Sequence, residues 1–318
     1  MSNNQGRIPT HVRLLLMRLI SFGRSVLFGT LFLFSQSSLA YPQESESSGP
    51  SALSSQSEPL RGIASEIARN LGKIGCSPKK CKILVTNFVL PTGGTSSFGI
   101  RLADALSVQL TKAELPLDVI ERAQFEELLQ RERLPAKVLY QEPVARWVAR
   151  RLDAGAVLIG ETNRISETSI ALSARLLNAR DEKKNSLSVT ARLLIDASKL
   201  DLTESNGLPP LPKLADTIGG EKIYRAGVKG VGLPKCFYIP SPAYTPEARA
   251  IHFSGTVLAE AVVTKSGMLE NVRIIVGAPG GLNESTLQTV QTWKCTPAEF
   301  EGRPVVTLVP FEVTFRLY

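Results

Sequence analysis

Histidine, aromatic residues and long apolar runs are scarce in this 318-residue chain. It contains two histidines, His11 and His252, and 6% aromatic residues. With so few imidazoles there is no histidine pair at zinc-ligand spacing, and His252 has no serine or cysteine at the spacing of a nucleophile and its base. The sequence therefore predicts a protein that is not an enzyme and that needs no metal ion or cofactor.

One glycine-rich loop, residues 93–99, follows an apolar run and leads into a helical pattern, as phosphate-binding loops do. Such loops continue with Lys and Ser or Thr, whereas Ile100 and Arg101 follow the last glycine here. We therefore interpret the segment as a loop that leads into a helix, with Ser96 or Ser97 as the helix cap.

Acidic residues are missing from the first forty positions, which contain four arginines. The whole chain has 37 basic and 29 acidic residues, so half of its net charge of +8 lies in this segment. The rest of the chain has an ordinary charge balance and shows no basic face with interleaved aromatic residues. Nucleic acid is therefore not an expected partner.

The same forty residues have the three parts of a secretory signal. A basic stretch to Arg24 precedes an apolar run, residues 25–34, and small residues stand at positions −3 and −1 before a cut after Ala40. The run is about half of the ~20 residues that a membrane-spanning helix needs. We expect export to the periplasm with cleavage of residues 1–40. The alternative is an uncleaved inner-membrane anchor over residues 12–34, which would contain three arginines.

The chain has only four cysteines: Cys76, Cys81, Cys236 and Cys295. An even number in an exported chain favours disulfides, and four cysteines allow three connectivities. Their spacing favours Cys76–Cys81 and Cys236–Cys295. Free buried thiols are an alternative, and a metal clip at the first pair is disfavoured because no histidine or acidic residue lies close by in the sequence.

An α/β pattern occupies the first half of the expected mature chain. Residues 41–62 are rich in Ser, Pro and Glu and are expected to form a flexible leader. From 63 to 196, apolar residues alternate between strand and helix periods. Strands are expected at 82–88, 117–120, 156–160, 169–177 and 187–195, and helices at 96–112, 122–133 and 144–152. This order predicts a mixed-sheet α/β domain.

Part of this domain resembles a known envelope module. The matching residues are 83–88, 99–106, 119–122 with Phe125 and Leu128–Leu129, and 154–160. In this order they resemble the α/β domain shared by the TolB N-terminal, FlgO and CsgG-like proteins. The resemblance covers about residues 80–180 and implies assembly with other envelope proteins, including copies of the same chain.

A second domain follows a stretch rich in proline and glycine. Residues 197–235 contain four prolines and six glycines and are expected to be a linker. Alternating strands are expected on both sides of a turn at Gly267, followed by a helix over about 284–293, with Asn283 at its cap, and a final strand over 305–317. This β-β-α-β order predicts a small domain, and the whole chain is assigned to the α+β class.

The last quarter of the chain, residues 236–318, carries a specific pattern. Its members are Pro242, Tyr244, Glu247, Ala248, Arg249, Gly255, Val257, Gly267, Gly281, Leu282, Trp293, Pro297, Ala298, Gly302, Pro304, Val305, Val313 and Phe315. In this order they resemble the C-terminal domain of the TonB family. That family usually has an aromatic residue two positions after the tryptophan, where this chain has Cys295. A disulfide to Cys236 is therefore expected to replace aromatic packing.

The resemblance implies that this domain binds a partner protein by strand addition. In the family, an edge strand pairs with a short extended segment of an outer-membrane transporter, and main-chain hydrogen bonds supply the affinity. The residues expected along the docking strand are Val305, Thr307, Val309, Phe311, Val313 and Phe315. The alternative is that they are core residues of a strand whose edge is unused.

The chain differs from TonB transducers in two features, and two hypotheses about its function therefore stay open. The N-terminus resembles a cleavable signal, and a folded domain with a short linker stands where a transducer has a long proline-rich rod. The first hypothesis is a TonB-family envelope protein associated with transport across the outer membrane. The rival is a periplasmic structural adaptor that transmits no energy and assembles through residues 80–196.

Overall fold

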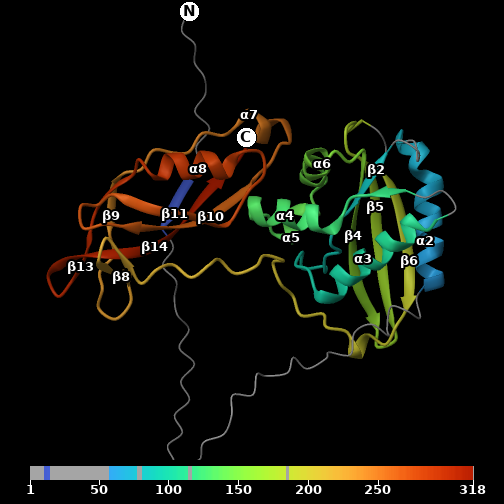
Figure 1. Cartoon of the computed structure of the whole chain (residues 1–318), viewed down its shortest axis with the longest axis horizontal. Helices are drawn as coiled ribbons and strands as arrows, with labels where there is room; N and C mark the ends of the chain where they lie inside the picture. The colour runs from blue at the N-terminus through green and yellow to red at the C-terminus, as the bar shows by residue number, and fades with distance from the viewer. Residues whose placement is uncertain (1–10, 15–56, 77–80, 114–116, 184–185, 318) are drawn as a thin grey trace, which may run out of the picture.

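The computed structural model describes residues 11–14, 57–76, 81–113, 117–183 and 186–317. The described chain forms two bodies, each built around its own sheet, and a long segment connects them (Figure 1). Helices and mixed sheets occur together, which confirms the predicted α+β class.

The first body contains a five-stranded mixed sheet with the order β3-β2-β4-β5-β6. The strands are β2 (Lys82–Val85), β3 (Asp118–Val119), β4 (Ala156–Ser166), β5 (Ser169–Asn178) and β6 (Leu187–Leu194). β2 is parallel to both β3 and β4, whereas β5 and β6 continue the sheet in antiparallel pairs. Parallel neighbours need crossover connections, and helices supply them here.

Helices cover both faces of this sheet (Figure 1). They are α2 (Ser57–Asn70), α3 (Ser97–Thr111), α4 (Arg122–Glu132), α5 (Ala136–Leu139) and α6 (Glu142–Arg151). Successive side chains of a strand point to opposite faces, so β2 and β4 contribute to two cores. Ile83 and Leu158 join the core under α2 and α3, and Leu84 and Val157 join the core under α4 to α6. The apolar runs of these strands follow from burial on both sides.

α2 starts at Ser57, inside the segment expected to be a flexible leader up to residue 62. Its apolar residues Leu60, Ile63 and Ile67 recur at helical spacing and are buried against the sheet. The surrounding Ser- and Glu-rich composition concealed this period. Residues 41–56 lie outside the described residues, as do 1–10 and 15–40 of the predicted signal. Among the helices of the described ranges, none is long and apolar enough to cross a membrane.

The second body is built around the strand β14 (Arg303–Phe315). The sheet path is β11-β10-β14-β8-β7, and two further strands, β1 and β13, also pair with β14. The remaining bounds are β1 (His11–Leu14), β7 (Thr217–Ile218), β8 (Glu221–Arg225), β10 (Gly255–Val263), β11 (Leu269–Val276) and β13 (Ala298–Phe300). With α8 (Leu282–Val290), the series β10, β11, α8, β14 reproduces the predicted β-β-α-β order.

Gly267 makes the turn between β10 and β11, as the sequence predicts. Its φ is 80°, and a Cβ at this position would lie 1.7 Å from the carbonyl oxygen of Cys295. Both the backbone conformation and the close approach therefore require glycine. Asn283, by contrast, is not the helix cap: Gly281 precedes α8, and Asn283 is buried within the first turn of the helix.

The segment 197–235 is expected to be a linker, but its second half contains two strands, β7 and β8. Gly219 and Gly220 have φ of 55° and 80° and form the tight turn of a hairpin between β7 and β8. β8 then adds to the sheet in parallel with β14, with Ile223 opposite Val306. Two of the six glycines that indicated a linker therefore form the turn of a hairpin in the C-terminal sheet.

Both predicted disulfides are present, Cys76–Cys81 and Cys236–Cys295. The second joins β9 (Lys235–Tyr238) to β12 (Lys294–Thr296), which together form a separate two-stranded sheet. Cys295 is buried beside the core of the second body. The replacement of aromatic packing by this disulfide stays a prediction.

Candidate functional site

β14 carries the predicted docking residues and has partners on both edges. β10 pairs with it from Thr307 to Phe315. Thr307 is also opposite Tyr224 of β8, so β8 lies on the other edge, which we name the outer edge. β1 is antiparallel to residues 311–314 of β14. Since β10 already pairs with these four residues, β1 also lies on the outer edge, beyond the end of β8 (Figure 1).

Even-numbered residues of β14 direct their backbone groups toward the outer edge. The carbonyl of Leu308 accepts a hydrogen bond at 3.3 Å from the amide of Ala226, which directly follows β8. In a strand the N–H and C=O of one residue point to the same side and alternate along the chain. Pro310, Glu312 and Thr314 therefore face the same way. Pro310 has no N–H to donate, which interrupts the outer ladder between β8 and β1.

The side chains predicted along the docking strand point into the core. Thr307, Val309, Phe311, Val313 and Phe315 are all buried, and Val305 is half-buried. The ring of Phe311 lies 5.1 Å from that of Trp293, and the ring of Phe315 lies 5.9 Å from that of Tyr244. A strand added at the outer edge would therefore bond to the even-numbered residues between them. Docking by this strand stays a prediction.

A second exposed strand edge lies at β9, which the sequence analysis did not single out. In the described part of the chain β9 pairs only with β12. Phe237 is 72% exposed, Tyr238 51% and Ile239 42%. An apolar strand edge open to solvent favours association with another chain. The uninterrupted apolar run directly after the proline-rich segment was the signal that could have identified it.

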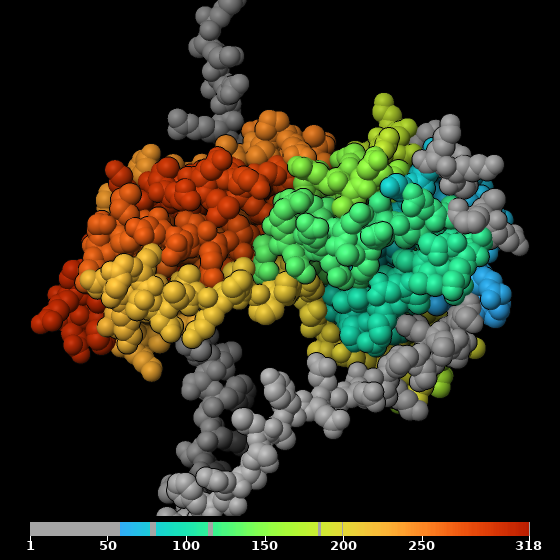
Figure 2. Space-filling model, in the orientation of Figure 1, coloured from blue at the N-terminus to red at the C-terminus, as the bar shows by residue number. Residues whose placement is uncertain are grey.

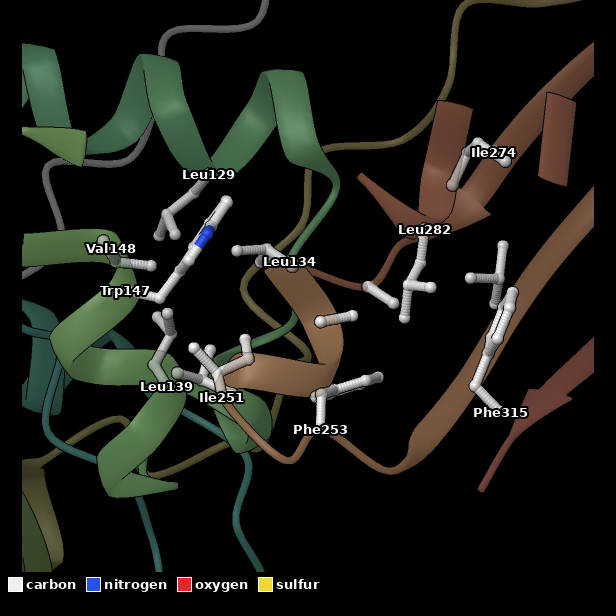
Figure 3. Close-up of a cluster of buried hydrophobic side chains, with 14 of the residues drawn as sticks. Leu129, Leu134, Leu139, Trp147, Val148, Ile251, Phe253, Ile274, Leu282 and Phe315 are labelled. Atoms are coloured by element: carbon white, nitrogen blue, oxygen red, sulfur yellow. The ribbon is translucent and has the colours of Figure 1, made fainter. Parts of the chain in front are cut away.

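An apolar interface joins the two bodies (Figure 3). Leu134, Leu139 and Trp147 come from the segment that contains α4 to α6. They belong to the same buried cluster as Ile251 and Phe253, which follow α7 (Pro246–Ala250) in the second body. All five are at most 3% exposed. The surfaces of the two bodies are continuous at this place, where the green and orange atoms meet (Figure 2).

Hydrogen bonds surround this apolar contact and reach main-chain groups across it. Arg133, in a left-handed conformation with φ of 53°, donates to the carbonyls of Ile275 and Pro209. The carbonyl of Arg133 accepts from the amide of Gly277 at 2.7 Å. Asn283 donates to the carbonyl of Glu132 at 2.8 Å. These directional bonds fix the orientation of one body on the other.

Charged and aromatic groups complete the interface at α7. The indole N–H of Trp147 donates to the Glu247 carboxylate at 2.8 Å, and Arg151 pairs with the same carboxylate at 3.2 Å. Burial raises the pKa of the Glu132 carboxyl, and the negative charge of Glu284 raises it further. Burial also lowers the pKa of the Arg133 guanidinium. The interface thus holds ionisable groups partly removed from water.

The features that could have indicated catalysis have structural roles. Ser96 accepts a hydrogen bond from the amide of Gly99 and caps α3, as predicted for the loop that leads into this helix. His252 is exposed and adopts a left-handed turn with φ of 48° after α7. Within the described ranges, no cluster of three or more His, Cys, Asp or Glu side chains could hold a metal ion.

Residues 240–317 match the model of the family described as the Gram-negative bacterial TonB protein C-terminal domain. This match covers the second body from just after β9 to the end of β14. No curated protein matches the chain. The resemblance of residues 80–180 to TolB N-terminal, FlgO and CsgG-like domains stays a prediction.

Among solved structures, three similar chains are informative to compare. The LpoB C-terminal domain of Salmonella enterica has a TM-score of 0.33 and 16% identity, covering 42% of this chain and 95% of its own. LpoB of Escherichia coli has a TM-score of 0.34 and 14% identity, covering 60% of this chain and 97% of its own. The Pseudomonas aeruginosa TonB C-terminal domain has a TM-score of 0.24 and 17% identity, with 30% and 94% covered. At these scores and identities they assign no function to this chain.

Proposed function

We propose, from the premise that residues 240–317 form a TonB C-terminal domain, that this chain is an exported envelope protein that binds a partner protein by strand addition. The partner segment lies along the outer edge of β14 beyond Pro310. An outer-membrane transporter is the first candidate partner. The proposal includes no catalytic step and no cofactor.

The observation that carries the proposal is the stretch of the outer edge that β8 does not cover. β8 covers only Val306 to Leu308. Beyond it, the backbone groups of Glu312 and Thr314 face outward and are paired by a four-residue extended segment, β1. Outward backbone groups that already pair with a short extended segment are what strand addition requires, since the added main chain supplies the hydrogen bonds.

The interface between the two bodies favours the adaptor form of this function. Strand addition needs only the β14 edge, whereas a force-transmitting domain would have to move relative to its anchor. Here Arg133, Asn283 and the apolar cluster hold the C-terminal domain against the α/β domain. We therefore place the docking site on a rigid two-domain unit in the periplasm. Coupling to an energy source stays the alternative.

A photo-crosslinking amino acid at Glu312 tests the proposal in bacterial envelopes. Glu312 is half-buried on the face opposite the core, beside the outward backbone groups. The matched control carries the same amino acid at Glu270, an exposed residue of β11 on the far side of β10. We expect adducts at 312 that are absent at 270, with the partner identified by mass spectrometry.

The identity of the adduct separates the candidates. An outer-membrane transporter joined at 312 supports the first candidate partner. Another envelope protein, or a second copy of this chain, supports the structural adaptor. Equal labelling at 312 and 270, or no adduct at 312, would contradict strand addition at this edge.

A further inference from the structure

The outer edge already has an occupant from the same chain. β1 lies antiparallel to β14 with His11 opposite Thr314, Val12 opposite Val313, Arg13 opposite Glu312 and Leu14 opposite Phe311. Figure 1 shows it as a dark blue strand among the red and orange elements of the C-terminal body, so it lies far in sequence from the other strands of that sheet. These four residues lie within the segment expected to be removed by cleavage after Ala40.

The register shows which backbone groups make this contact. Glu312 and Thr314 direct their N–H and C=O groups to the outer edge, because they share the parity of Leu308. Their antiparallel partners in the register are Arg13 and His11. In such pairs both residues exchange hydrogen bonds, whereas the residues between them do not. The backbone of Arg13 therefore bonds to β14, and the backbone of Val12 faces away.

β1 covers the stretch that β8 leaves open. β8 ends at the position opposite Leu308, and Pro310 separates it from the pair formed by β1. A partner strand needs the same groups of Glu312 and Thr314, so it cannot bind while β1 is in place. Since β1 belongs to the same chain, its effective concentration at the edge does not depend on the protein concentration, and a free peptide has to compete with it.

We propose that His11–Leu14 is an internal occupant that closes the docking edge in the chain that retains residues 1–40, and that cleavage after Ala40 opens it. That this edge is a docking site rests on the proposed function. The pairing of β1 with β14 is observed independently of it. The protein thereby keeps an aggregation-prone strand edge covered until its N-terminal segment is removed.

The first experiment tests the contact in the full chain, produced without export so that residues 1–40 remain. In the variant R13C/E312C the two Cα atoms are expected about 5.5 Å apart, which a disulfide spans. The control R13C/L258C uses the residue of β10 opposite Glu312. Because β14 lies between them, that pair is expected to be about 10 Å apart.

Mild oxidation followed by peptide mapping gives the result. We expect the 13–312 link within single chains and no 13–258 link. Equal yields for the two pairs, no 13–312 link, or a link only between chains would overturn the internal occupant. The native pairs Cys76–Cys81 and Cys236–Cys295 serve as internal standards for complete oxidation.

The second experiment tests closure with full-chain variants and a labelled peptide that copies residues 9–16 as the probe. R13P removes the backbone N–H that bonds to Glu312. The control V12P removes a backbone N–H that faces away from β14. The control R13A keeps the N–H of residue 13 but removes its charge. We expect R13P to bind the probe at least about tenfold more tightly than the wild-type chain, V12P or R13A. Equal binding by all four would refute closure.

Failure of this inference and of the proposed function can be distinguished. The 13–312 link requires no partner, so it would form even if photo-crosslinking at 312 captured nothing from envelopes. Conversely, a partner captured at 312 together with no 13–312 link would leave strand addition intact and remove the internal occupant.

Discussion

Asn283 links the two bodies through a buried side-chain hydrogen bond. It is 5% exposed, accepts from the amide of Ala278 at 2.9 Å and donates to the carbonyl of Glu132 at 2.8 Å. The sequence analysis assigned it to a helix cap, because a polar residue before a helical pattern is typical of caps. The structure shows instead that its amide joins a main-chain group of its own body, the amide of Ala278, to one of the other body, the carbonyl of Glu132.

Replacing Asn283 by Ala leaves a buried donor and a buried acceptor unpaired. We expect N283A to lower the free energy of unfolding by about 1–3 kcal/mol, measured by denaturant titration. The control Q288A changes an exposed residue of the same helix and is expected to stay within about 0.5 kcal/mol of the wild type. Equal losses in both variants would show that Asn283 has no special role.

Glu132 gives the interface a pH dependence. Burial and the charge of Glu284 raise its pKa above the ordinary 4.5, so its ionised form is disfavoured in the folded state. The stabilising contribution of the protonated group is complete below the unfolded pKa and is lost as the pH rises through the folded pKa. We expect E132Q to be more stable than the wild type at pH 7 and similar to it near pH 4. The control is E127Q, on the exposed face of α4. An equal gain in the free energy of unfolding for E127Q at pH 7 would show that the burial of Glu132 is not the cause.

At the scale of elements, the sequence predicts most of the strands and helices, because burial on both faces of β2 and β4 produces unmistakable apolar runs. It misses α2, whose period the Ser- and Glu-rich composition conceals, and strands whose pairing partner lies far away in the sequence. β8 lies in a segment rich in glycine and proline, and its place beside β14 is decided by a tertiary contact. β1 lies within a pattern typical of export signals, so nothing local predicts that it forms a strand of this sheet.

The two disulfides close loops of very different length, and their removal is expected to differ accordingly. Cys236–Cys295 spans 59 residues and Cys76–Cys81 spans five. In the chain-entropy description the cost grows with loop length, so we expect C236S/C295S to lower the free energy of unfolding by about 4 kcal/mol, and C76S/C81S by less. Denaturant titration of both variants measures this. A larger loss in C76S/C81S would contradict the loop-length explanation. It would indicate that local packing matters more, at a place where a Cβ on Gly155 would lie 2.7 Å from the Cys81 sulfur.

At the scale of the whole molecule, the sequence predicts two domains separated by a linker but not how the two domains meet. Periodicity shows that Trp147 and Ile251 are buried residues of their own elements, but it cannot show which surfaces bury each other. The structure places both in one apolar cluster. This contact changes the functional argument, because a fixed C-terminal domain suits an adaptor better than a mobile force transmitter.

The shared cluster predicts how the described two-body unit unfolds. Since side chains from both bodies complete one core, we expect a single calorimetric transition for the wild type. I251D places a charge in the interface, where Ile251 is 3% exposed, and is expected to split the transition in two, because each body retains its own sheet. V108D, at a position 46% exposed on α3, is the matched control and should keep one transition. Two transitions in the wild type would show that the bodies unfold independently, and the adaptor reading would then lose the rigid contact on which it rests.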